Sequence, residues 1–224
     1  VDLGQHKTEH GEDFYQISPR GYVPAIETDE YGLVTENAAV LPFLAQKMGA
    51  LPDGEAHWRL HEWIGFIGTE IHNAYGPLFG GAEGDAKEKA KKTVAKKYQL
   101  AETLMDGREW LVGSSPSVAD NYLFVTLLWA DKFGVDLPQS LVAYRERHLQ
   151  REAVKKAMAD EGLGKRRASR TRRCTSGTSS ASNQACLRMN MVDRHEGWGR
   201  GIVSPNARQL AIRSAMVCWR VSGR

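Results

Sequence analysis

The first 163 residues of this 224-residue chain contain no cysteine, because the three cysteines are Cys174, Cys186 and Cys218. Their spacings match no zinc module, and an odd, scattered set argues against a disulfide framework. The chain also has no run of 18 or more apolar residues, and its polar first residues lack the apolar core of a signal peptide. We therefore expect a cytoplasmic protein without a membrane-spanning segment.

The last part of the chain has few acidic side chains and almost no lysine. Residues 165–224 carry 12 Arg, one Lys and two Asp or Glu, whereas residues 1–164 carry 17 Lys and Arg against 25 Asp and Glu. Such a reversal of charge rarely occurs within one fold. Because residues 166–183 have hardly any apolar side chains and no helical or strand period, they cannot offset their ordering entropy. We expect residues 164–224 to form a basic, low-order tail.

Three interpretations of this tail remain open. Clustered arginines release phosphate counterions on binding, so the tail could be a nucleic-acid arm, but it contains no recognisable nucleic-acid module. It could be an ordinary disordered extension. An out-of-frame reading of the coding region would explain the excess of Arg over Lys. We favour this last interpretation and do not expect the tail to bind nucleic acid.

The body begins with strand signals. Residues 1–3 have the composition of a strand end, and residues 21–26 run from a turn glycine through Val23 and Pro24 into a short apolar strand. Residues 27–32 predict a hairpin loop, and residues 33–35 predict the returning strand. From Glu36 to Met48 the apolar residues follow helical spacing. A Val-Pro pair at the mouth of a strand marks a sheet edge or a cis turn.

Beyond a break at residues 51–54, the chain predicts helices as far as residue 162. Ser117 and Asp120 have the spacing of a capping box, which opens a third helix whose residues 122–129 are apolar nearly all round. A final helix is predicted over 141–160. The first of these helices, which includes residues 60–78, has one apolar stripe. The second, which includes residues 90–105, has apolar residues facing inward and lysines facing outward. The stripe comprises Leu60, Ile64, Ile67, Ile71, Tyr75 and Leu78, and the second helix is outlined by Ala90, Val94, Ala101 and Met105.

Two features invite a chemical interpretation that we do not favour. His57 and His61 are four residues apart with Glu62 adjacent, a spacing that could place two imidazoles on one helix face. Their order matches neither of the zinc-protease helix motifs, so we expect no metal site. Asp120 is expected to cap its helix rather than to act as a catalytic carboxylate.

The order of motifs resembles the cytosolic glutathione transferases, and among them most closely the bacterial beta class, over about residues 1–163. The resemblance is carried by SPRGYVPA at 18–25, LVTE at 33–36, TEIH at 69–72, VAD at 118–120 and EGL at 161–163. It implies an α/β part followed by an all-α part: a partial thioredoxin-like domain at 1–49, a linker at 50–54 and a helical bundle at 55–163. The tail at 164–224 lies outside the resemblance.

The resemblance also implies roles for individual residues. Pro24 would follow a cis bond, and the backbone of Val23 would pair with the cysteinyl part of glutathione as an added strand. Glu36 and the backbone amides near Asn37 would hold the γ-glutamyl group. His72 would point at the thiol as an auxiliary catalytic group, and with Asn73 it would border the electrophile. His6 and Tyr22 would make further glutathione contacts.

The implied activity is conjugation of the glutathione thiol to hydrophobic electrophiles, or glutathione thiol exchange, by a homodimer without a metal. Glutathione would be the co-substrate. The chain begins at the family's second strand, so we expect the strand and helix that carry the catalytic Cys, Ser or Tyr to be missing. The alternative function is therefore that of a truncated or frame-shifted member, at most a weak glutathione binder or dimerisation partner.

Overall fold

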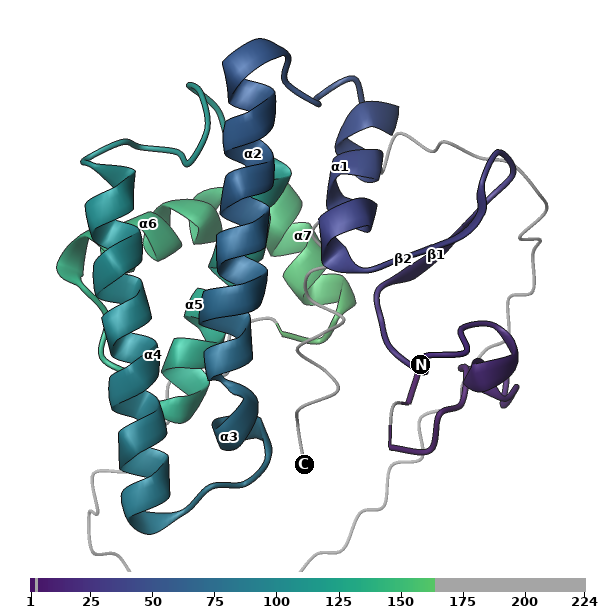
Figure 1. Cartoon of the computed structure of the whole chain (residues 1–224), viewed down its shortest axis with the longest axis horizontal. Helices are drawn as coiled ribbons and strands as arrows, with labels where there is room; N and C mark the ends of the chain where they lie inside the picture. Colours follow the sequence, from purple (N-terminus) through teal and green to yellow (C-terminus); the bar gives the residue numbers. More distant parts are fainter. Residues whose placement is uncertain (3, 164–224) are drawn as a thin grey trace, which may run out of the picture.

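The structure, a computed structural model, describes residues 1–2 and 4–163 (Figure 1). The predictions for the basic tail lie outside these residues. A small N-terminal part with a hairpin and one helix lies beside a bundle of longer helices. In chain order the elements are η1 (Phe14–Gln16), β1 (Ala25–Thr28), β2 (Gly32–Thr35), α1 (Asn37–Lys47), α2 (Gly54–Phe66), the π-helical η2 (Ile67–His72), α3 (Gly76–Phe79), α4 (Gly84–Met105), α5 (Val118–Phe133), α6 (Gln139–Gln150) and α7 (Glu152–Asp160).

The hairpin formed by β1 and β2 is antiparallel, with Ala25 opposite Thr35 and Thr28 opposite Gly32. The Thr28 hydroxyl donates to the Gly32 carbonyl at 3.0 Å, which helps to close the turn. As the Val-Pro pair at its mouth predicts, β1 starts after the Val23–Pro24 bond, but it continues to Thr28, two residues into the segment predicted as a loop. A place directly before the strand is the expected position for a proline, which has no N–H to donate to a ladder.

The strand predicted at residues 1–3 is wrong for the part that the structure describes. Asp2 pairs with Lys7 only through an isolated bridge. The reason is local: the Asp2 carboxylate accepts hydrogen bonds from the amides of Gly4 and Gln5, at 2.8 and 3.1 Å. A side chain that bonds the backbone two and three residues ahead favours a turn over an extended strand.

The predicted apolar stripe is confirmed, since all six of its members are buried. Five of them lie on α2, η2 and α3, and Tyr75 lies directly before α3; all six pack into the same core as the buried residues of α1, α4 and α5. Residues 122–127 and Trp129 of α5 are also buried, so this helix is central, as its apolar sequence predicts. Burying a large apolar side chain contributes about 1.5–3 kcal/mol, which makes this shared core the main stabilising element of the fold.

The start of α5 is fixed by the predicted capping box and by further hydrogen bonds to the Asp120 carboxylate. The Ser117 hydroxyl accepts from the Asp120 amide, and the Asp120 carboxylate accepts from the Ser117 amide at 2.7 Å. The same buried carboxylate accepts from the Leu111 amide and from the Tyr144 hydroxyl, both at 2.8 Å. Asp120 therefore joins α5 to the preceding loop and to α6.

The single helix predicted over 141–160 is wrong, because Arg151 separates α6 from α7. Its backbone is extended, with φ −71° and ψ 128°. The Arg151 guanidinium donates to the Asn121 side-chain oxygen at 2.9 Å and lies 3.0 Å from Nδ1 of His148. These contacts with the partly buried start of α5 outweigh the helix-forming tendency of the surrounding sequence. No helix in the described part of the chain is long and apolar enough to cross a membrane.

Candidate functional site

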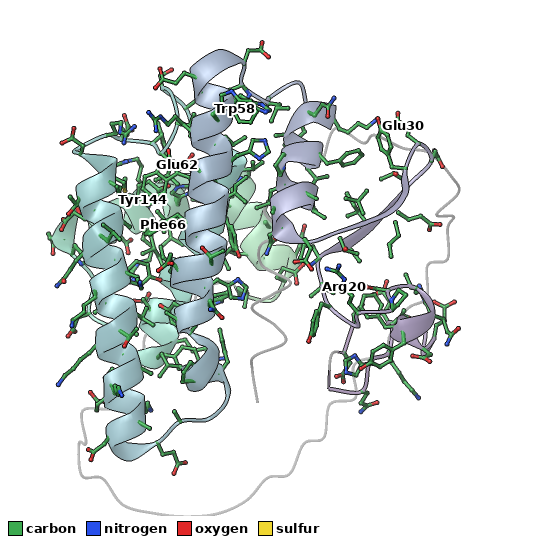
Figure 2. The ribbon with its side chains drawn as sticks, in the orientation of Figure 1. Arg20, Glu30, Trp58, Glu62, Phe66 and Tyr144 are labelled. Carbon is green, nitrogen blue, oxygen red and sulfur yellow. The ribbon has the colours of Figure 1, made fainter. Side chains whose placement is uncertain are left out.

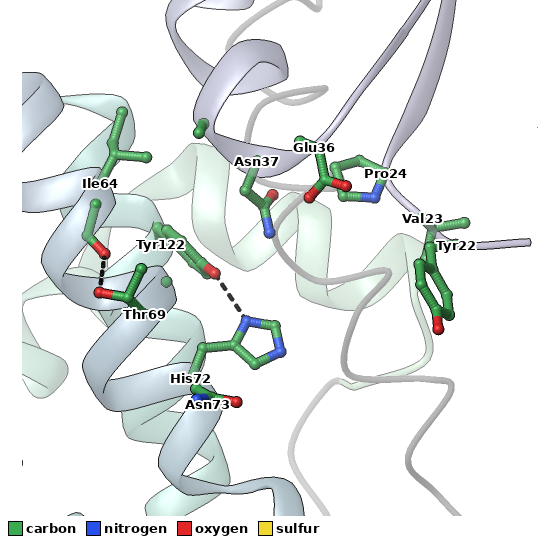
Figure 3. Close-up of a pocket in the computed structure, with 13 residues that line it drawn as sticks. Tyr22, Val23, Pro24, Glu36, Asn37, Ile64, Thr69, His72, Asn73 and Tyr122 are labelled. Carbon is green, nitrogen blue, oxygen red and sulfur yellow. Dashed lines mark hydrogen bonds between the residues drawn. The ribbon is translucent and has the colours of Figure 1, made fainter. Parts of the chain in front are cut away.

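A cavity of about 650 Å³ lies between the hairpin with α1 on one side and α2, η2 and α5 on the other (Figure 3). It is open to solvent and combines backbone, carboxylate, amide, imidazole and apolar groups. The lining residues are Tyr22, Val23, Pro24, Glu36, Asn37, Ala38, Ile64, Gly65, Gly68, Thr69, His72, Asn73 and Tyr122.

The hairpin side of the cavity has two unusual backbone features. The Val23–Pro24 peptide bond is cis, as the resemblance of residues 18–25 predicts. Glu36 has a φ of 72° and a ψ of 134°, a conformation that costs a non-glycine residue about 1–3 kcal/mol. Such strain clusters at ligand-binding positions. The Glu36 carboxylate is more than half exposed and pairs with Arg20 at 2.5 Å.

Helix α1 begins at this cavity. The amides of Ala39 and Val40 both donate to the Glu36 carbonyl, at 3.0 and 2.8 Å, and so form the first turn. The amides of Asn37 and Ala38 precede them, at the positive end of the helix dipole. The side-chain oxygen of Asn37 is buried and has no hydrogen-bond partner among the described residues. A helix start with an unsatisfied buried polar atom is suited to binding an ionic ligand.

The bundle side of the cavity is shaped by the π-helical turn η2. Its wider turn contains one residue more than an α-helical turn, which rotates the residues that follow. His72 ends the turn and Asn73 follows it, and both face the cavity (Figure 3). The Thr69 hydroxyl satisfies the Gly65 carbonyl at 2.9 Å. A side chain added at Gly65 would meet no protein atom within 4 Å, so glycine there keeps space open in the cavity.

His72 is held by two aromatic residues of α5. Its Nδ1 lies 2.7 Å from the Tyr122 hydroxyl oxygen, and its ring meets the Trp129 ring edge-on with centroids 4.8 Å apart. Burial lowers the pKa of His72 below 6.5. The imidazole is therefore neutral at pH 7, when it has one N–H and one lone pair for hydrogen bonding.

The structure brings most of the predicted site residues together. Tyr22, Val23, Pro24, Glu36, Asn37, His72 and Asn73 all line the cavity. His6 does not, because it stacks on Tyr15 with ring centroids 4.3 Å apart and lies 3.1 Å from the Tyr15 hydroxyl. Its position gives no support to the predicted glutathione contact. Sequence reasoning missed Tyr122, although a hydroxyl within an apolar helix signals a need for a polar partner.

The two histidines of α2, His57 and His61, lie close together in space. The rings of His57 and His61 have centroids 4.7 Å apart. Within the described residues, no group of three or more His, Cys, Asp or Glu side chains is placed to hold a metal ion.

Comparison with known proteins accounts for this combination of parts. Residues 66–152 match the model of the glutathione S-transferase C-terminal domain. The chain is 32% identical to glutathione S-transferase GstA of Escherichia coli O157:H7, over 73% of this chain and 85% of that one. It is 36% identical to glutathione S-transferase GST-4.5 of Xanthomonas campestris pv. campestris, over 67% and 81%.

Solved structures agree. A sphingomonad glutathione S-transferase complexed with glutathione superposes with a TM-score of 0.67 at 38% identity, over 73% of this chain and 86% of that one. The bacterial beta-class enzyme of Sphingomonas chungbukensis gives 0.66 at 38%, over 73% and 85%. The chain therefore belongs to the glutathione S-transferase family and is similar to its bacterial beta class.

Proposed function

We propose that this chain binds glutathione in the 650 Å³ cavity. The observation that carries the proposal is the joining of a helix start, a carboxylate and a neutral imidazole in one open cavity. The amides at the start of α1 would take the γ-glutamyl carboxylate, and Glu36 would take the ammonium group. Val23 would pair its backbone with the cysteinyl residue, which directs the sulfur toward His72.

The catalytic event would be attack by the glutathione sulfur on an electrophile. The thiol first gives its proton to solvent or a base, and the thiolate then forms a bond to an electrophilic atom as a leaving group departs or a double bond opens. Ile64, Asn73 and Tyr122 border the side of the cavity next to His72, where a hydrophobic electrophile would bind. Holding both reactants together lowers the entropic part of the barrier.

We assign residues 1–49 to the glutathione-binding part, 50–54 to a linker and 55–163 to the helical part. We further propose a homodimer with two-fold symmetry. Tyr31 on the hairpin is 70% exposed and Trp58 on α2 is 71% exposed, which is unusual for large aromatic side chains. Figure 2 shows Trp58 at one end of α2. Sedimentation equilibrium should show a dimer at micromolar concentration, weakened by Trp58→Glu. A monomeric wild-type chain would contradict this assembly.

The test of the binding proposal is titration calorimetry with glutathione. Glu36→Gln removes the charge that would pair with the ligand ammonium, and the site is partly exposed, so we expect Kd to rise about 10-fold. Glu30→Gln is the matched control, because Glu30 is an exposed carboxylate that pairs with Lys47 outside the cavity lining. Equal affinity of wild type and Glu36→Gln would reject this placement of the ligand.

A further inference from the structure

Tyr122 fixes the orientation of the His72 imidazole at the cavity. Its hydroxyl oxygen is 2.7 Å from Nδ1 of His72, and Tyr122 is only 2% exposed. The two residues are 50 positions apart, one at the end of η2 and the other on the central helix α5. The contact therefore ties the π-helical turn to the core of the bundle at the cavity wall (Figure 3).

The His72 ring has little freedom to turn away from this contact. Trp129 meets it nearly at right angles, with an interplanar angle of 75°, and Tyr122 meets it at 76° with ring centroids 6.0 Å apart. Trp129 is fully buried, so its ring is held by the core. Because Nδ1 is engaged by Tyr122, the opposite nitrogen, Nε2, is the one left to meet a ligand.

The hydrogen bond also selects which nitrogen carries the proton. A neutral imidazole has one N–H, and its position is set by the bond that the other nitrogen makes. A phenol is a good donor and a poor acceptor, whereas an unprotonated imidazole nitrogen is a good acceptor. The favoured arrangement is donation from the Tyr122 hydroxyl to Nδ1, which leaves the proton on Nε2.

We propose that Tyr122 is a positioning residue, which holds His72 in the tautomer that presents Nε2–H to the glutathione sulfur. His72 then donates a hydrogen bond to the thiolate and does not accept the thiol proton. This inference rests on the proposed function, since it needs the sulfur near His72. The other titratable side chains that line the cavity, Tyr22 and Glu36, come from the opposite wall. Within residues 1–2 and 4–163, neither side chain hydrogen-bonds to His72, pairs with it or stacks on it.

The first measurement tests the tautomer without any ligand. Long-range proton–nitrogen NMR on the full chain, with histidine labelling and a His72→Gln variant for assignment, reports which ring nitrogen is protonated. We expect Nε2–H in the wild type and a mixture of tautomers in Tyr122→Phe, which lacks only the hydroxyl. A wild-type ring protonated on Nδ1 would overturn the proposal, as would an unchanged spectrum in Tyr122→Phe.

The second measurement follows the thiol of bound glutathione through the ultraviolet absorbance of the thiolate as pH rises. In Tyr122→Phe, the misoriented His72 donor should raise the pKa of the bound thiol by about 0.5–1. At pH values below that pKa, the fraction of bound glutathione present as thiolate should then be about 3- to 10-fold smaller than in the wild type. At pH 5.5, where the thiol is protonated, the Kd of Tyr122→Phe for glutathione should differ from that of the wild type by less than about twofold. A bound thiol pKa equal in wild type and Tyr122→Phe would refute the proposal.

Tyr98→Phe is the matched control. Tyr98 is also a buried tyrosine, but its hydroxyl bonds the Thr126 carbonyl at 2.7 Å and Tyr75 at 2.9 Å. It should leave the His72 tautomer and the thiol pKa unchanged, and equal effects of the two variants would assign the change to general loosening. If the wild type binds no glutathione, the proposed function fails, whereas the NMR measurement still decides the role of Tyr122 in the His72 tautomer.

Discussion

Replacing Asp120 by alanine should be among the most damaging single changes to the helical bundle. Asp120 is fully buried, and its carboxylate accepts from the Leu111 amide, the Ser117 amide and hydroxyl, and the Tyr144 hydroxyl. Burial raises the pKa of both Asp120 and Tyr144, so the two groups share one desolvated environment. Alanine at position 120 would take the carboxylate acceptor away from the Leu111 amide, the Ser117 amide and the Tyr144 hydroxyl.

The magnitude follows from these contacts. Loss of the cap interaction costs about 1 kcal/mol, and each buried donor left unsatisfied costs about 1–3 kcal/mol. Because removing a buried carboxylate also removes its own desolvation cost, we expect a net loss of about 3 kcal/mol of unfolding free energy. For a chain of this size that corresponds to a fall in Tm of about 6–12 °C.

Urea unfolding followed by circular dichroism at pH 7 measures this loss. Glu62→Ala is the control, because Glu62 lies in the middle of α2 in the same bundle and pairs with Arg59, and both side chains are more than half exposed. An exposed pair of this kind contributes less than about 1 kcal/mol. Equal destabilisation by the two substitutions would refute the view that Asp120 is the junction of α5, α6 and the preceding loop.

Two further predictions concern other parts of the fold. Burial, with the nearby cations of Arg151 and Arg147, lowers the pKa of His148 to about 3. Its contribution to stability is therefore present above about pH 6.5 and is lost as pH falls from there toward 3. Between pH 7.5 and 4.5 the wild type should lose about 2–3 kcal/mol more than His148→Gln in urea unfolding, and equal losses would contradict this. In the N-terminal part, Gly21→Ala should be more damaging than Gly32→Ala. Both glycines have positive φ, but a Cβ at Gly21 would lie 2.6 Å from the Tyr15 ring, whereas one at Gly32 would meet nothing within 4 Å. Hydrogen exchange of the Phe14 amide, which donates to the His6 carbonyl, should quicken only in Gly21→Ala, and equal exchange would dismiss the steric argument.

Patterns that depend on one helix or one turn could be predicted from the sequence. The stripe from Leu60 to Leu78 is set by helical periodicity, and the box of Ser117 and Asp120 by local backbone geometry. The positions of Val23 and Glu36 at the cavity came from resemblance to a family, since spacing alone gives no three-dimensional neighbour.

Features that depend on distant partners could not be predicted. Nothing in the local sequence breaks a helix at Arg151, and its contacts lie with Asn121, 30 residues away. The pairing of Tyr122 with His72 crosses 50 residues. The place of His6 outside the cavity lining likewise depends on a distant partner, because its ring stacks against Tyr15. Long-range polar contacts leave no periodic signal in a sequence.

The π-helical turn also affects how this chain can be compared with, or redesigned from, its relatives. A π-helical turn holds one residue more than an α-helical turn, so removing one residue within residues 67–71 would let this turn close to α-helical winding with the later residues still in place. His72 would then keep its direction toward the cavity, whereas a deletion in the α-helical stretch before Ile67 would turn it by about 100° around the helix axis. A sequence alignment that places a gap a few positions away from the π-helical turn would therefore match the wrong residue to the imidazole.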